Sequence, residues 1–263
     1  MTPRSKQLLI DLRAEKGADL SPHDLTGIVL SDPLLCLRLL RAAECLRSHH
    51  LAHETTTALG AIMKLGVDEF CRMLTESEEV DDTVAGLMEV EARAALASRI
   101  AMYWASGRQD LSPEEVAVAS LLVDTGELLL WVYAPELPQA AKDELASGEA
   151  QRSVQAQRQA CGFDFRSLTI RCAEQWNLPG LICQLLRGSE TVRAKLSRSS
   201  TNAARHLIEQ SVSSEAAIAA DLVEVQKLLP GASVEWLIDG LIFVPPERIP
   251  IIEELMHGSA LAS

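Results

Sequence analysis

Hydrophobic residues recur along the chain with the spacing of amphipathic helices. In residues 33–45 leucines alternate with single charged side chains, which predicts a helix with a wide buried face that includes Leu34. Residues 117–130 are mostly apolar, with Asp124 and Glu127 as their only charged residues, and predict a second buried helical segment. Strand patterns are almost absent. Only residues 241–246 are a candidate for an extended segment, and two prolines end it at once. The pattern predicts an all-α protein.

Helix starts and ends are marked by capping residues, prolines and glycines. Ser21 precedes Pro22, and Asp24 stands where its carboxylate can answer the free amides of a helix start, as in a capping box. The same logic predicts starts at Asp32-Pro33, at Ser112-Pro113 with Glu115 completing a second capping box, and at Asn177, and ends at Gly66 and Gly188. These independent marks agree on a multi-helix bundle.

Two polar connections divide the chain. Residues 75–82 are acidic, and residues 187–200 are polar and locally basic. We therefore expect an N-terminal helical lobe at 1–82, a helical core at 83–190 and a C-terminal helical extension at 191–263.

Composition and charge narrow the classes of function. With 48% hydrophobic residues in 263, the chain can bury a substantial core. A formal net charge of −13 argues against nucleic acid as a partner, because binding to phosphates needs a surplus of lysine and arginine. No charged-then-apolar leader and no uncharged run near ~18 residues occur, so we expect neither a signal peptide nor a membrane span. Six scattered cysteines without a Cys-x-x-Cys pair predict reduced thiols and a cytoplasmic location.

Several segments together resemble the HDOD domain family, a bacterial relative of the HD-type metal-dependent phosphohydrolases. They are "SDPLLCLRLLRAAEC", the Ala61-Ile62-x-x-Leu65-Gly66 signature, "ASLLVDTGELLL" and Trp176-Asn177-Leu178-Pro179. Their order and spacing across roughly residues 15–210 carry the resemblance. It implies an HD-like helical bundle and a role in bacterial signal transduction.

The resemblance also indicates that the metal site of the hydrolases is lost here. Val123 stands at the histidine of the His-Asp doublet and leaves Asp124 alone, and Phe165 replaces a second histidine. Further ligands would fall near Arg187 and Glu91. We expect no metal, no cofactor and no enzymatic activity, because one carboxylate cannot hold a catalytic cation against water.

The remnant site leaves two interpretations for its carboxylate. Asp124 and Glu91 could form a weak magnesium site, or Asp124 caps a helix end or pairs with an arginine such as Arg171 or Arg187. We favour the second, because valine and phenylalanine at the lost positions indicate a packed apolar interior. Val123 and Phe165 should then be buried close together.

Other candidate chemistry is weaker. His49, His50 and His53 could suit zinc by spacing, but an exposed polar turn is the better interpretation. The Cys161 thiol could be activated near a helix start, but a buried structural cysteine is the better interpretation. The aromatic side chains of Trp104, Trp131 and Tyr133 either line a ligand pocket or close the core, and helical spacing favours the core.

Three functions remain in order of preference. The first is a non-catalytic signalling module that binds a protein partner, with a homodimer left open. The second is a nucleotide or cyclic-dinucleotide sensor in the former metal cavity, where Arg93, Arg171 or Arg187 would meet phosphates. The third is an active phosphohydrolase.

A basic segment is the candidate surface for that partner. It holds Arg193, Lys195 and Arg198, flanked by Arg187 and Arg205. The alternative is an ordinary solvated helix face, which we favour. If the segment binds an acidic protein surface, reversing Arg193, Lys195 and Arg198 to glutamate should abolish capture and leave the fold intact.

Overall fold

The computed structural model describes residues 1–17, 19–46, 53–81, 83–209 and 213–260. Every regular element in these residues is a helix, which confirms the all-α prediction. The expected extended segment at 241–246 is wrong. The chain turns there, and Ile242 and Phe243 adopt left-handed conformations with φ of 45° and 78°.

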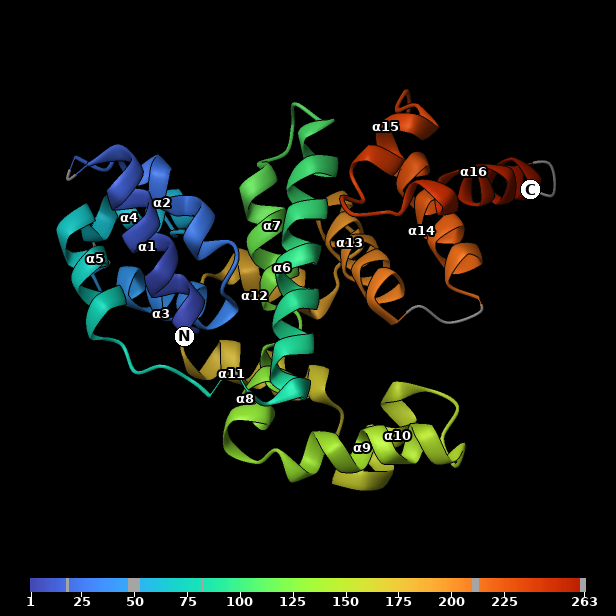
Figure 1. Cartoon of the computed structure of the whole chain (residues 1–263), viewed down its shortest axis with the longest axis horizontal. Helices are drawn as coiled ribbons and strands as arrows, with labels where there is room; N and C mark the ends of the chain where they lie inside the picture. Colours follow the sequence, from blue (N-terminus) through green and yellow to red (C-terminus); the bar gives the residue numbers. More distant parts are fainter. Residues whose placement is uncertain (18, 47–52, 82, 210–212, 261–263) are drawn as a thin grey trace.

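Helices α1 to α5 form the N-terminal lobe, drawn in blue and cyan in Figure 1. Leu35, Leu39 and Leu40 are fully buried and fill the centre of this lobe, while Leu34 is only partly buried. The lobe's hydrophobic cluster continues into Leu121 of α7, so the lobe packs directly on the middle of the molecule. The helices are α1 (Pro3–Lys16), α2 (Pro22–Val29), α3 (Pro33–Cys45), α4 (Ala58–Leu65) and α5 (Val67–Glu76).

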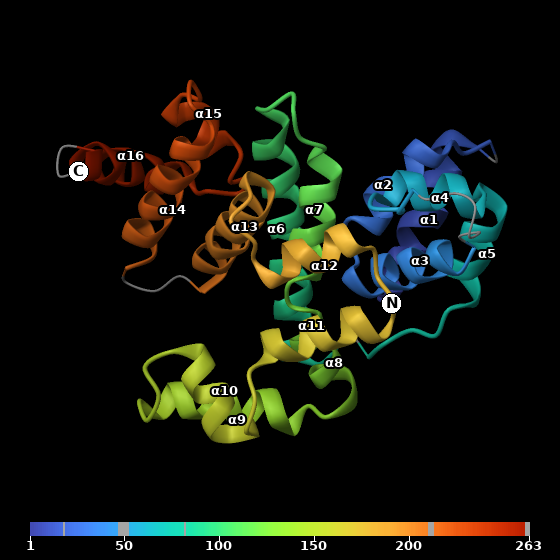
Figure 2. The ribbon, with the colours of Figure 1, turned by 180° about the vertical axis from the view of Figure 1, so that it is seen from behind.

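Two paired helices, α6 and α7, run through the centre and separate the N-terminal lobe from the C-terminal helices (Figures 1 and 2). The chain turns at Val123 and Asp124 into α8, and α9 and α10 pack on each other below it. Helix α11 then crosses α8, and α12 returns to α7. The bounds are α6 (Ala85–Ser106), α7 (Pro113–Leu122), α8 (Thr125–Tyr133), α9 (Glu136–Ser147), α10 (Ser153–Cys161), α11 (Phe165–Gln175) and α12 (Gly180–Arg187).

The C-terminal helices cover the other side of α6. Ile100 and Trp104 of α6 share one hydrophobic cluster with Leu207 and Leu222. The Trp104 ring is fully buried, and its Nε1 donates to the carbonyl oxygen of Leu237 at 3.0 Å. The elements are α13 (Val192–Glu209), α14 (Ser214–Leu228), α15 (Val234–Asp239), a 3-10 turn (Pro246–Arg248) and α16 (Ile249–Ala260).

Several predicted helix ends are confirmed. Ser21 and Asp24 form the reciprocal capping box of α2, and Asp32 accepts from the Leu35 amide at 2.9 Å at the start of α3. Glycines at 66 and 188 end α4 and α12 with positive φ, which a residue with a Cβ adopts only at a cost.

One predicted helix start is wrong, and another is confirmed without its predicted capping box. Helix α7 starts at Pro113 after Ser112, as expected. The Ser112 side chain makes no capping bond, and the Glu115 carboxylate accepts instead from the hydroxyl of Thr56 at 2.8 Å. Asn177 has a φ of 52° and lies in the turn before α12, which starts only at Gly180. Long-range contacts and a left-handed turn thus override the local capping pattern.

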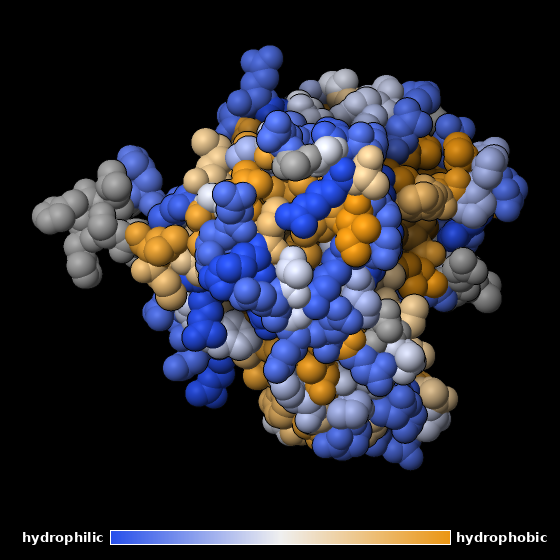
Figure 3. Space-filling model, turned by 60° about the vertical axis from the view of Figure 1, so that its left-hand side comes forward, coloured by the Kyte–Doolittle hydropathy of each residue, from blue (hydrophilic) through white to orange (hydrophobic). Residues whose placement is uncertain are grey.

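The most apolar stretch of the chain lies in the core. By length and composition alone, Pro113–Tyr133 could cross a membrane, with a mean hydropathy of 1.6, but 61% of this window is buried in the protein. The surface differs in character. On the face seen in Figure 3, hydrophilic side chains cover most of the area and hydrophobic ones appear in patches between them.

Candidate functional site

The turn between α7 and α8 carries the carboxylate singled out in the sequence. Asp124 is the residue before α8, but its side chain caps no helix amide. Its Oδ2 accepts instead from Nε of Arg93 at 2.8 Å. The expectation that Asp124 pairs with an arginine is confirmed, but the arginine is neither Arg171 nor Arg187. It lies 31 residues earlier, on α6, and Asp124 caps no helix end.

Arg93 is a buried cation held by two carboxylates. Its side chain is 10% exposed, and Nη2 donates to Glu127 at 2.8 Å while Nε contacts Asp124. Glu127 lies one turn after Asp124 on α8, so both acids reach the same guanidinium. The three side chains form a charge cluster between α6 and α8.

The environment acts on these charges in opposite directions. Burial disfavours the charged guanidinium, but Asp124 and Glu127 more than offset it and raise the pKa of Arg93. Burial raises the pKa of Glu127, and Arg93 opposes that shift. A buried pair of this kind is strongly destabilised when one partner is removed, because the other charge stays buried and unpaired.

The crossing of α8 over α11 needs a glycine. A Cβ on Gly126 would lie 2.4 Å from the Phe165 carbonyl oxygen and 2.9 Å from the Thr169 amide nitrogen. The Thr169 hydroxyl accepts from the Gly126 amide at 2.9 Å and lies 3.0 Å from the Val123 carbonyl oxygen. The Asp-x-Gly pattern therefore has a packing role here that needs no metal.

The structure separates most residues of the predicted remnant site. Asp124 and Phe165 line one pocket, which does not include Glu91, Val123 or Arg187. Val123 packs against the hydrophobic cluster of the N-terminal lobe. Arg187 lies at the end of α12 and pairs with Glu174 at 2.5 Å.

Phe165 is buried as expected, but its side chain and that of Val123 do not pack in the same hydrophobic cluster. Its ring belongs to a separate cluster with Leu130 and Ala141. The two residues are linked through their backbones, because the Thr169 hydroxyl lies within 3.2 Å of both the Phe165 and the Val123 carbonyl oxygen. Val123 and Phe165 therefore belong to two separate hydrophobic clusters, and the expected common apolar interior is wrong.

The pocket beside Arg93 is small and its charges are largely paired. Its volume is about 150 Å³. The Lys142 ammonium on its wall pairs with Glu89 at 2.5 Å, and Arg205 donates to Asn202. Arg93 is already neutralised by two acids. The pocket therefore offers little free positive charge to a phosphate group.

The residues present do not fit a catalytic metal. Val123 and Phe165 supply no ligand atoms, and the Asp124 carboxylate is engaged by Arg93. Within the ranges that the structure describes, no three His, Cys, Asp or Glu side chains stand where they could hold a metal ion. His49 and His50 of the histidine cluster lie outside the described residues.

The basic segment on α13 is largely neutralised by neighbouring acids. Arg193 Nε lies 3.6 Å from Glu115, and Lys195 pairs with Glu190 at 3.0 Å. Arg198 is exposed. Reversing Arg193 to glutamate would place its new carboxylate beside that of Glu115 at a partly buried position. We therefore expect the triple reversal to destabilise the fold, in contrast to the expectation from the sequence. Arg198 alone offers an exposed charge for such a test.

The aromatic residues of the central block divide between core and surface. Trp104 and Trp131 are buried, as predicted. Tyr133 is 80% exposed, so its assignment to the core is wrong.

Comparison with known proteins decides the family. The HDOD domain profile matches residues 9–192, more than half of the sequence. The chain belongs to the HDOD domain family. No curated protein matches this HDOD protein.

Solved structures share the fold of this HDOD protein at low sequence identity. The MmoQ response regulator of Methylococcus capsulatus is 19% identical, with a TM-score of 0.66 over 92% of this chain and 96% of that one. A virulence factor of Campylobacter jejuni is 16% identical, with a TM-score of 0.70 over 94% of this chain and 92% of that one. Both alignments extend over most of the chain, beyond the range of the family profile.

The ion pairs that join Arg93 to Asp124 and Glu127 were not predicted from the sequence. Arg93 was considered only as a phosphate ligand, and Glu127 was given no role. The available signal was the position of Arg93 within "EARAALAS", where an arginine interrupts an otherwise small and apolar helix face. A charged residue in such a face needs a partner, and the Asp124/Glu127 spacing of three provides two.

Proposed function

We propose that this HDOD protein is a non-catalytic module of a bacterial signal transduction pathway and acts by binding a protein partner. The observation that carries the proposal is the ion pair between Arg93 and Asp124. A fixed cation engages the one carboxylate that the HD-type doublet retains, and Glu127 completes its neutralisation. The site thereby uses its charges for structure.

The relatives support a signalling role. One is named as a response regulator and another as a virulence factor, and neither name states an enzymatic reaction. Their similarity to this chain supports a shared scaffold, while the role in signalling is our proposal.

The geometry favours a protein partner over a nucleotide in the former metal cavity. The pocket beside Arg93 has about 150 Å³, whereas sites for small organic ligands span roughly 300–1,000 Å³. Of the three arginines considered for phosphates, only Arg93 lines this pocket, and it is neutralised.

Metal and activity measurements test the proposal. The purified protein should contain no stoichiometric transition metal by elemental analysis. It should hydrolyse neither bis(p-nitrophenyl) phosphate nor cyclic dinucleotides with added Mn²⁺, Fe²⁺ or Mg²⁺. Val123→His should stay inactive, because it restores one ligand only. Metal-dependent turnover by the unmodified protein, lost in Asp124→Asn, would make it an enzyme and overturn the proposal.

A further inference from the structure

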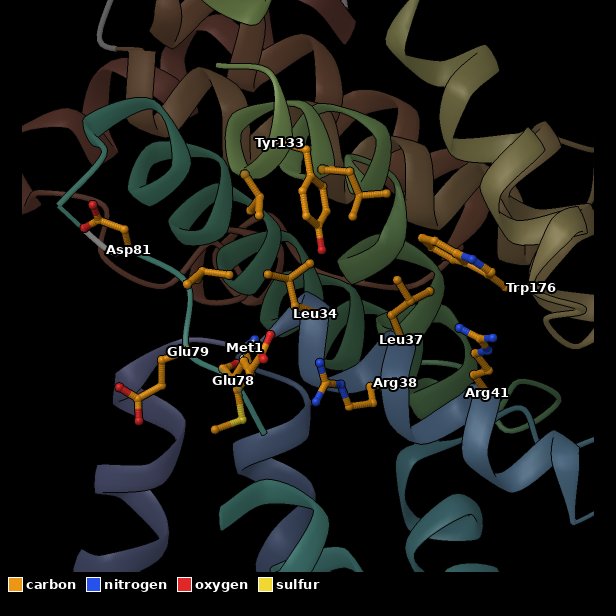
Figure 4. A pocket seen from close by; sticks show the side chains of 13 residues that line it. Met1, Leu34, Leu37, Arg38, Arg41, Glu78, Glu79, Asp81, Tyr133 and Trp176 are labelled. Carbon is orange, nitrogen blue, oxygen red and sulfur yellow. Dashed lines mark hydrogen bonds between the residues drawn. The ribbon is translucent and has the colours of Figure 1, made fainter. Parts of the chain in front are cut away.

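A second, larger pocket lies between α3 of the N-terminal lobe and α8, and its lining shares no residue with the pocket beside Arg93 (Figure 4). We call it the α3–α8 pocket. Its volume is about 450 Å³, within the range of sites for small organic molecules. Leu34 and Leu37 of α3 and Leu129 and Val132 of α8 provide its apolar wall.

Two aromatic side chains line the pocket, and Trp176 also packs against the hydrophobic cluster of the N-terminal lobe. Tyr133 is 80% exposed, and its hydroxyl points towards Leu34 in Figure 4. Trp176 follows the end of α11 and is partly exposed. Flat rings on the walls of a pocket favour a flat apolar ligand.

Two arginines, three residues apart on α3, reach the same pocket. Arg38 donates through Nη1 to the Ser77 hydroxyl at 2.6 Å and keeps its other N–H groups for a ligand. Arg41 is exposed and has no hydrogen bond or ion pair within the described part of the chain. In Figure 4 its guanidinium lies next to Trp176. An arginine fork of this kind matches a carboxylate in two hydrogen bonds.

Acidic side chains limit how much negative charge the ligand can carry. Glu78, Glu79 and Asp81 line the pocket from the segment between α5 and α6. Glu79 pairs with Lys6 at 2.8 Å, whereas the Glu78 carboxylate has no hydrogen bond or ion pair within the described residues. A dianionic phosphate would meet about twice the repulsion that a single carboxylate meets, so a monoanion placed at the two arginines suits the pocket better.

We propose that the α3–α8 pocket binds an aromatic monocarboxylate. Its carboxylate contacts Arg41 and Arg38, and its ring lies on the leucine wall between Tyr133 and Trp176. A ligand in this position touches the N-terminal lobe and the core together, and so stabilises their packing. The inference goes beyond the proposed function and does not depend on it, since the charge cluster takes no part.

Calorimetry with naphthalene-2-carboxylate tests the proposal on the full chain. Binding should saturate at one site per chain. The uncharged naphthalene-2-carboxamide should bind at least about tenfold more weakly, which corresponds to ~1.4 kcal/mol. Phenyl phosphate, tested at pH 8 where it is a dianion, should also bind more weakly.

Variants locate the site. Arg41→Gln should weaken naphthalene-2-carboxylate about tenfold or more, and Tyr133→Ala should weaken the acid and the amide alike. Arg171→Gln, at an exposed arginine on α11 outside the pocket, is the matched control and should bind as the unmodified protein does. Glu78→Gln should tighten the acid, because it removes a nearby negative charge.

Three outcomes would overturn the proposal. They are the absence of saturable binding, equal affinity for acid and amide, and unchanged affinity in Arg41→Gln. Thermal unfolding of each variant confirms that it is folded. All four substituted side chains, Arg41, Glu78, Tyr133 and Arg171, are exposed, so loss of the fold does not confuse the result. The metal and hydrolysis measurements remain unaffected by any of these outcomes.

Discussion

At the scale of single residues, one arginine accounts for the charge balance of the site. Arg93 brings a permanent positive charge into the interior, where a bare guanidinium would be costly, and two acids from α8 compensate it. A metal ion would demand the same carboxylate oxygens. Arg93 therefore determines the charge balance of this site more than the loss of the histidine at Val123 does. None of the motifs that resemble the family contains Arg93.

Removing Arg93 should cost more than removing another arginine of the same helix. For Arg93→Ala we expect a loss of about 3–5 kcal/mol in the free energy of unfolding, because Asp124 and Glu127 stay buried without a cation. Urea denaturation at pH 7 measures it. Arg99→Ala, exposed on the same helix and resting over Phe243, is the control and should lose less than ~1 kcal/mol. Equal losses would mean that the ion pair carries no special weight.

At the scale of elements, a close crossing of two helices holds the site together. The start of α8 touches α11 at Gly126, and one threonine hydroxyl joins the α7–α8 turn to α11. Because Asp124 lies two residues before this crossing, the crossing also fixes the direction of its carboxylate towards α6. Packing and electrostatics therefore depend on the same contact.

A methyl group at this crossing should disturb it. Gly126→Ala would bring a Cβ to 2.4 Å from a backbone oxygen, so α11 must shift, and we expect a loss of about 1–3 kcal/mol, as for other overpacked sites. Gly27→Ala in α2 is the control. A Cβ there meets nothing within 4 Å, so it should gain up to ~1 kcal/mol of helix propensity. Thermal and urea unfolding of both variants measure the contrast. A neutral Gly126→Ala would show that α11 adapts freely.

At the scale of the whole molecule, the helices after the family profile belong to the same packed body. The profile ends at residue 192, yet the buried face of α6 around Trp104 is covered by α13, α14 and α15. The two structural neighbours, which align over 92% and 94% of this chain, also extend beyond that point. The C-terminal helices are thus needed to bury α6.

Shortening the chain tests this role. A fragment ending at residue 190 would expose Trp104, Ile100 and the rest of the α6 face. We expect it to bind the dye ANS, to lose near-ultraviolet circular dichroism and to unfold without a sharp transition. A fragment that melts as cooperatively as the full chain would show instead that the first 190 residues form an independent domain.

Local patterns in the sequence were enough to predict the helical class, the family and several helix ends. Amphipathic periodicity and capping residues act locally, so Ser21-Pro22, Asp32-Pro33 and the glycine stops could be recognised without a partner. Where a side chain bonds to a group far away in the sequence, the local pattern predicted the wrong partner. Glu115 turned to Thr56 rather than to its own helix, and Asn177 entered a left-handed turn.

Only the tertiary structure decided the candidate site. Asp124 and Arg93 are 31 residues apart and meet because α6 packs beside α7 and α8, which no spacing in the sequence expresses. The same holds for Val123 and Phe165, which the motif places together and the packing assigns to separate clusters. Burial raises the energy of an unpaired charge, and the fold alone determines which charges are buried and which partner each one finds.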